Sequence, residues 1–222
     1  GRMALQIGVK RQKAFLDSMG FFDPTPFEIV EASGGQPLLP ERWTDLSAVT
    51  ISYGHGLSSS PMHLAAGYAT IANGGRAVTP TLLKKTGPVY GPRVMSEGAA
   101  KAARMMLRKV VSQGTASFGE VEGYAVGGKT GTADKPNPSG GYFEKKVIAT
   151  FVSMFPAHDP KYVLIVTLDE PVESSGDKPR RTAGWTAVPV AAEMIRRIAP
   201  LLGMRPTVEP RTLADITLTS SN

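Results

Sequence analysis

Apolar residues recur at helical spacing in four separate stretches of the chain, with polar residues between them. The stretches are residues 1–19, 60–72, 96–113 and 187–202. The second begins with Ser60 as a predicted N-cap, because a serine hydroxyl can accept a free N–H group at a helix start. The pattern therefore predicts four helices.

From Val121 onward the apolar pattern becomes that of strands. Extended segments are predicted for residues 124–133, 147–155 and 162–168. Residues 156–161 join the second segment to the third, and so short a connection forms a hairpin because a parallel crossover needs a dozen residues or more. Helices, then antiparallel strands, then a covering helix are the element order of an α+β domain.

The segments between these elements are less regular. Residues 20–43 are rich in proline and glycine and are predicted to connect elements, while residues 48–52 fit a short strand or the approach to a turn. We expect one domain over residues 1–203 and a loosely held tail over residues 204–222. Because the chain starts inside a predicted helix, which few proteins do, we also expect another half of the domain upstream.

Composition and charge are those of an ordinary globular protein. Hydrophobic residues make up 41% of the 222 residues and charged residues 20%, which argues against disorder. Lys plus Arg exceed Asp plus Glu by 25 to 19, but the basic residues are scattered and not interleaved with aromatic residues. We therefore expect no nucleic-acid partner.

Several kinds of chemistry are excluded by the polar residues present. The chain has no cysteine, which rules out thiolate chemistry and disulfides. Its histidines, His55, His63 and His158, are too far apart for a metal site, and each is predicted to be a capping or surface residue. Asp169 and Glu170 end a predicted strand and should point to opposite faces, so they should form no carboxylate dyad. We expect no cofactor.

Residues 123–133, GYAVGGKTGTA, match two motifs that predict different chemistry. The first eight residues fit G-x-x-x-x-G-K-[ST], a phosphate-binding loop, and the last five contain the K-T-G triplet of penicillin-reactive serine enzymes. A phosphate loop needs a buried strand before it and a helix that begins at its lysine. Residues 118–122 are polar, however, and residues 131–141 contain two prolines and three glycines. The sequence therefore favours a strand.

On a strand, the side chains of Thr130 and Thr132 share one face because side chains alternate. Their hydroxyls could then donate to a single carboxylate, while Gly131 leaves room for close approach of a substrate. Lys129 adds a positive charge that could stabilise an anion or hold down the pKa of a neighbouring group. The triplet by itself also fits an ordinary strand with a surface lysine, and on the motif alone this alternative stays open.

Three separated blocks carry a resemblance to a known family. They are residues 53–75, 127–133 and 147–157, in the order and at the spacing of class B penicillin-binding proteins. Over residues 3–203 the chain resembles the C-terminal half of their transpeptidase domain, most of all the cell-division type. The resemblance implies a partial fold of the penicillin-binding protein and serine β-lactamase kind. This is an α+β fold with an antiparallel sheet, a covering C-terminal helix and part of a helical subdomain.

Members of this family carry S-x-x-K, S-x-N and K-T-G in that chain order, and this chain contains only the third element in its expected place. Residues 175–178 spell S-x-x-K after K-T-G, but Gly176 and Pro179 disfavour the helical turn that would put serine and lysine on one face. Residues 220–222 spell S-x-N at the chain end. We therefore expect the nucleophilic serine in the upstream half and no activity of this chain alone.

The resemblance implies a D,D-transpeptidase that cross-links peptidoglycan stem peptides ending in D-Ala-D-Ala through a serine acyl-enzyme. It also implies reaction with β-lactam antibiotics. It gives catalytic roles to Lys129 and to the backbone N–H of Thr132, as half of an oxyanion hole. Thr130, Gly131 and Thr132 are implied to bind substrate, with both hydroxyls on the terminal carboxylate. Asp134 stands where many relatives carry a polar or basic residue, which affects substrate preference.

The same resemblance implies partners and a location. The partners are the upstream half of the domain and divisome membrane proteins, among them a glycan polymerase. The location is the periplasmic face of the bacterial inner membrane, anchored by an N-terminal span that this chain does not contain. A second interpretation is a module of the same fold that lost the chemistry and serves as a scaffold in wall synthesis. The presence or absence of S-x-x-K upstream distinguishes the two.

Overall fold

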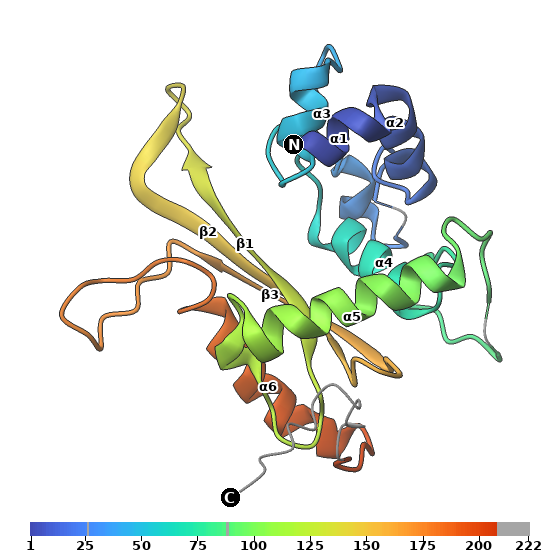
Figure 1. Cartoon of the computed structure of the whole chain (residues 1–222), viewed down its shortest axis with the longest axis vertical. Coiled ribbons are helices and arrows are strands. Elements are labelled where there is room, and N and C mark those ends of the chain that lie inside the picture. Colours follow the sequence, from blue (N-terminus) through green and yellow to red (C-terminus); the bar gives the residue numbers. More distant parts are fainter. Residues whose placement is uncertain (26, 88, 208–222) are drawn as a thin grey trace, which may run out of the picture.

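The structure is a computed structural model that describes residues 1–25, 27–87 and 89–207. In chain order its elements are α1 (Arg2–Ile7), α2 (Val9–Ser18), the 3-10 helix η1 (Val30–Gly34), α3 (Asp45–Ile51), α4 (Pro61–Ala72), α5 (Glu97–Gln113), the 3-10 helix η2 (Ser117–Gly119), β1 (Gly127–Pro136), β2 (Tyr142–Phe155), β3 (Tyr162–Asp169) and α6 (Ala187–Leu201). Figure 1 shows α1, α2 and α3 grouped to one side of the strands, with α6 on the other side.

Three of the four predicted helices, α4, α5 and α6, form within one residue of the expected bounds. Ser60 and Ser96 cap α4 and α5, where their hydroxyl oxygens accept the N–H groups of His63 and Ala99 at 3.4 and 3.1 Å. The Ser60 N–H in turn donates to His63 Nδ1 at 3.2 Å, so this histidine is a capping residue, as predicted. Each such cap stabilises its helix by about 1 kcal/mol.

Two predictions for the N-terminal part are wrong. The single helix expected over residues 1–19 is broken at Gly8, whose φ of 79° and ψ of 155° lie outside the helical region. For residues 48–52 the strand alternative is wrong, because these residues largely belong to α3, which leads into a turn at residues 52–54. Thr44 and Ser47 form a reciprocal capping box there. This local hydrogen bonding starts a helix that the β-branched run Val-Thr-Ile does not suggest.

The strands form one antiparallel sheet in the order β1–β2–β3, as predicted, with β1 at an edge. β1 begins at Gly127 and not at residue 124, because Ala125 has a positive φ of 40° that interrupts the extended chain. The β1–β2 pair continues to Pro136, with residues 137–141 as the connecting turn. β2 and β3 form the predicted hairpin.

The core lies between the sheet and α6. Phe151 and Phe155 of β2 and Ile195 of α6 are fully buried. Ala187 and Ala191, one helical turn apart, are also fully buried, and their small side chains allow α6 to pack closely on the sheet. Burial of each large apolar side chain contributes about 1.5–3 kcal/mol. This packing fixes the position of β2 and, through the strand pairing, that of β1.

The helix α5 packs against β1 at close range. A Cβ added at Gly127 would lie 3.2 Å from the backbone nitrogen of Arg108 in α5. A Cβ added at Gly128 would lie 2.4 Å from the Val152 carbonyl oxygen and 2.7 Å from the Phe151 ring. Packing therefore requires a glycine at position 128, whereas a Cβ at position 127 would make a tight contact that small shifts can relieve; both residues hold the K-T-G strand close to α5 and β2.

The residues that follow α6 make further contacts. Met204 packs against the core, and the Thr207 N–H donates to the Gly123 carbonyl oxygen at 2.8 Å. Residues 208–222 lie outside the described residues, so the division between a domain and a tail at residue 203 stays a prediction. Among the helices of the described ranges, none is long and apolar enough to cross a membrane.

Candidate active site

The K-T-G triplet lies within β1, where Lys129 stands opposite Val152 and Thr130 opposite Phe151. Residues 129–136 are extended. A phosphate-binding loop would place its lysine in the first turn of a helix. The phosphate-loop interpretation is therefore excluded, and the predicted strand with its antiparallel partner β2 is confirmed.

The hydroxyls of Thr130 and Thr132 lie on the face of β1 that contacts two other segments of the chain. Thr130 Oγ1 is 3.0 Å from Thr115 Oγ1, which follows α5. Thr132 Oγ1 accepts a hydrogen bond of 3.0 Å from the N–H of Ala183, which precedes α6. Because an amide N–H can only donate, the Thr132 hydroxyl retains its own hydrogen for another acceptor. This face of β1 can therefore donate hydrogen bonds to an anion.

Lys129 and Gly131 belong to the opposite face of β1 by the alternation of side chains. The Lys129 side chain is exposed, and its Nζ donates to the Thr130 carbonyl oxygen at 2.7 Å. A Cβ added at Gly131 would meet the Thr150 carbonyl oxygen only at 4.0 Å, so packing within the described residues does not require this glycine. The fold therefore needs Gly128, directly before the K-T-G triplet, but does not need Gly131, the glycine of the triplet itself.

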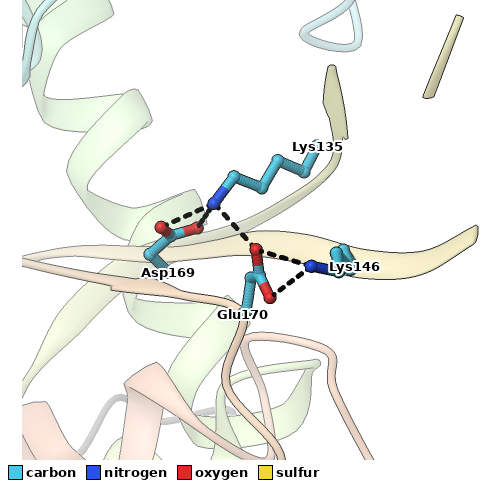
Figure 2. Close-up of polar contacts among 4 residues, drawn as sticks. All are labelled: Lys135, Lys146, Asp169 and Glu170. Atoms are coloured by element: carbon cyan, nitrogen blue, oxygen red, sulfur yellow. Dashed lines mark hydrogen bonds and ion pairs between the residues drawn. The ribbon is translucent and has the colours of Figure 1, made fainter. Parts of the chain in front are cut away.

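Four charged side chains gather where β3 ends (Figure 2). Lys135 of β1 places its Nζ 2.7 Å from Asp169 Oδ2 and 2.9 Å from Glu170 Oε1. Lys146 of β2 lies 3.1 Å from Glu170 Oε2. The prediction that Asp169 and Glu170 point to opposite faces is wrong, because Glu170 has a positive φ of 51° and leaves the extended conformation. Both carboxylates instead converge on one ammonium group.

These contacts shift the ionisation of the cluster. The hydrogen bond from Lys135 to Asp169, and next that to Glu170, raises the pKa of the Lys135 ammonium. The hydrogen bonds from Lys135 and Lys146 lower the pKa of Glu170. The side chains are partly exposed, so each ion pair contributes little by itself. Together they connect β1, β2 and the end of β3, just beyond the K-T-G triplet.

Two residues that contact the threonines of β1 carry no signal in the sequence. Thr115 follows the end of α5, and Ala183 supplies only its backbone N–H. No motif marks either residue, because each reaches β1 only through the packing of distant segments.

The S-x-x-K look-alike at residues 175–178 has no helical turn. The Ser175 N–H instead donates to the Glu173 carboxylate at 2.6 Å. The S-x-N look-alike at residues 220–222 lies outside the described residues. In the part of the chain that the structure describes, no group of three or more His, Asp or Glu side chains could hold a metal ion.

The family described as the penicillin binding protein transpeptidase domain matches residues 2–193. The chain belongs to this family. Among curated penicillin-binding proteins, it is similar to the probable peptidoglycan D,D-transpeptidase FtsI of Caulobacter vibrioides, with 32% identity over 96% of this chain. The resemblance that the K-T-G block and its neighbours predicted is thereby confirmed.

Solved structures of penicillin-binding proteins share the fold. The transpeptidase domain of penicillin-binding protein 3 from Burkholderia pseudomallei aligns with a TM-score of 0.82 and 33% identity over 94% of this chain. Penicillin-binding protein 3 from Mycobacterium tuberculosis, solved in complex with ampicillin, aligns with a TM-score of 0.80 and 27% identity over 94% of this chain. The predicted transpeptidase fold is therefore confirmed.

This penicillin-binding protein chain matches only part of each of these proteins. It spans 38% of the Caulobacter relative, 62% of the Burkholderia chain and 49% of the Mycobacterium chain.

Proposed function

We propose that this chain forms the K-T-G wall of a peptidoglycan D,D-transpeptidase site. The observation that carries the proposal is the pair of hydroxyls on one face of an edge strand, those of Thr130 and Thr132, beside the exposed charge of Lys129. Membership of the penicillin-binding protein family gives this arrangement its chemical context.

The proposed substrate is a peptidoglycan stem peptide that ends in D-Ala-D-Ala. Thr130 and Thr132 donate their hydroxyl hydrogens to its terminal carboxylate, and each hydrogen bond to such a charged acceptor contributes about 1.5–3 kcal/mol. Gly131 between them leaves space for the peptide beside the strand. The carboxylate of a β-lactam is bound by the same two hydroxyls.

Acyl transfer begins when a serine of the upstream half, its proton taken by a neighbouring base, attacks the carbonyl carbon of the penultimate D-Ala. The amide bond breaks, and the terminal D-Ala leaves with a proton on its nitrogen. The amine of a neighbouring stem peptide then attacks the acyl-enzyme, forms the cross-link and releases the serine, which regains its proton. Lys129 supplies a positive charge near these proton transfers.

The backbone N–H of Thr132 is the proposed donor to the oxyanion that forms in each step. One feature that supports this role is the position of β1 at the edge of the sheet. Another is the hydrogen bond from Lys129 Nζ to the Thr130 carbonyl oxygen. In a strand, the C=O of one residue and the N–H of the residue two further on face the same edge, so the Thr132 N–H faces the edge that Lys129 reaches. Removal of one oxyanion donor typically lowers the rate about 10²–10³-fold.

The proposed substrate also suggests where the protein acts. Peptidoglycan lies outside the inner membrane, so we place the site at the periplasmic face, with the whole protein anchored by a span outside this chain. The proposed partners are the upstream half of the domain and membrane proteins of cell division that include a glycan polymerase.

A fluorescent penicillin tests the proposal. We expect no covalent labelling of this chain alone and stoichiometric labelling once the chain is co-expressed with the preceding part of its domain. Excess ampicillin should prevent the labelling. A reassembled domain that stays unlabelled would contradict the acyl-enzyme function and favour the scaffold. Stable labelling of the chain alone would contradict an upstream nucleophile, and Ser175 would then be the first residue to replace.

A further inference from the structure

Two segments outside β1 contact the threonine hydroxyls of the K-T-G strand. The first follows α5 and contributes the Thr115 hydroxyl, 3.0 Å from Thr130 Oγ1. The second precedes α6 and contributes the Ala183 N–H, 3.0 Å from Thr132 Oγ1. Each threonine oxygen of the proposed carboxylate site therefore already has one partner from outside the strand.

The two segments also pack on each other. A Cβ added at Gly184 would lie 2.7 Å from the Thr115 carbonyl oxygen, so the two backbones meet at this point. The rings of Phe118 and Trp185 lie 5.0 Å apart, and the Arg180 guanidinium stacks over the Trp185 ring at 3.7 Å. We call residues 115–118 and 183–185 the threonine platform, because their mutual contacts fix the position of both groups that reach the threonines.

The direction of the hydrogen bonds decides what the threonines can bind. A hydroxyl has one hydrogen to donate and lone pairs that accept. The Ala183 N–H must donate, so the Thr132 hydroxyl oxygen accepts this hydrogen bond and the hydroxyl keeps its own hydrogen for a ligand. When Thr115 donates to Thr130 in the same sense, the Thr130 hydrogen is also released toward a ligand. Both hydroxyls then present hydrogen atoms, which match the two oxygens of one carboxylate.

We propose that Thr115 is a positioning residue of the carboxylate site: its hydroxyl donates to Thr130 and thereby directs the Thr130 hydrogen toward the terminal carboxylate of the ligand. The proposal rests on the carboxylate-binding part of the proposed function. Thr115 does not touch the ligand. It acts by excluding the alternative orientation, in which Thr130 donates to Thr115 and presents only a lone pair to an anion.

The test is a binding measurement on the chain. N-acetyl-D-Ala-D-Ala and its C-terminal amide are titrated against the parent, Thr115→Val and Thr115→Ser, with the backbone NMR signals of β1 as readout. Valine keeps the shape of threonine without the hydroxyl, whereas serine keeps the hydroxyl. Loss of one hydrogen-bond orientation should raise the Kd of the carboxylate about two- to tenfold in Thr115→Val. It should leave the Kd of the amide unchanged, and Thr115→Ser should restore the parent value.

The sheet offers a matched control. Thr150 and Thr167 form another pair of threonine hydroxyls, 3.1 Å apart, between β2 and β3. Thr167 lies on β3, which pairs with β2 and not with β1, so Thr167→Val removes a hydroxyl from such a pair on a strand that is not paired with the K-T-G strand and should leave both Kd values at their parent levels. Thermal unfolding of each variant shows that the fold is retained.

Three results would overturn the positioning role. These are an unchanged Kd of the carboxylate in Thr115→Val, an equal rise for carboxylate and amide, and no binding of the carboxylate to the parent chain. Failure of the proposed enzymatic function is distinguishable. In that case the carboxylate binds with the expected dependence on Thr115, while the reassembled domain is not acylated by penicillin.

Discussion

Gly128, directly before Lys129, and Gly131, two residues after it, allow packing and substrate binding to be tested separately within one short segment of β1. We consider the substitutions Gly128→Ala and Gly131→Ala, which add the same methyl group to the same strand. At Gly128 the added Cβ would lie 2.4 Å from the Val152 carbonyl oxygen and 2.7 Å from the Phe151 ring. At Gly131 the first neighbour within reach is the Thr150 carbonyl oxygen at 4.0 Å.

The expected magnitudes follow from these distances. Neither the Val152 carbonyl oxygen, as backbone, nor the fully buried Phe151 ring can move away cheaply. Gly128→Ala should therefore lower the free energy of unfolding by about 1–3 kcal/mol, the usual range for overpacking. For a protein of this size this corresponds to a fall in Tm of roughly 2–12 °C. Gly131→Ala meets no clash and should change the free energy of unfolding by less than about 0.5 kcal/mol.

The substitution that leaves stability unchanged, Gly131→Ala, is the one expected to impair acylation through the substrate site. Gly131→Ala keeps the fold but puts a methyl group into the space proposed for substrate, so the reassembled domain should be acylated by penicillin more slowly than the parent. The assays are thermal or urea unfolding of the chain and the second-order rate constant of acylation of the reassembled domain. Equal destabilisation by both substitutions would refute the packing analysis. Parent-like acylation of Gly131→Ala would refute the placement of substrate beside Gly131.

Two further predictions concern charged side chains. Lys129→Ala should slow acylation of the reassembled domain by about 10²-fold, while the free energy of unfolding changes by less than about 0.5 kcal/mol. Acylation at the parent rate would show that Lys129 is an ordinary surface residue. The exposed Lys145 provides the control substitution Lys145→Ala, which should change neither. In Lys135→Met, the deficit in Tm relative to the parent should be largest near neutral pH. The deficit should shrink as the pH falls through the pKa of Glu170, which is lowered below its ordinary 4.5. It should also shrink as the pH rises through the pKa of Lys135, which is raised above its ordinary 10.5. A deficit independent of pH would show that the ion pairs do not stabilise the sheet.

Features that depend on neighbouring residues could be predicted from the sequence. Ser60 before Pro61 indicates the start of α4, and the polar residues around GYAVGGKTGTA are incompatible with a phosphate loop. The alternation of side chains on a strand is also enough to place Thr130 and Thr132 on one face. These inferences hold because caps, turns and strand periodicity are set within a few residues.

Features that depend on distant contacts or on unusual backbone conformations could not be predicted. Thr115 and Thr130 are 15 residues apart, and Ala183 and Thr132 are 51 apart, so no local pattern connects them. The positive φ of Glu170 reverses the expectation from alternation. For the candidate site, the sequence therefore predicts the strand and its hydroxyls, while the groups that orient them become visible only in the folded chain.

The order of the strands has a consequence for how this protein folds. Each strand pairs with the one that follows it in the chain, across the short connections at residues 137–141 and 156–161. Closing such short loops costs little chain entropy, so the sheet can form early. The contact between Ala183 and Thr132 must instead wait for a segment 51 residues away to close over the strand. Substitutions in the sheet should therefore slow folding, whereas substitutions in the threonine platform should mainly accelerate unfolding.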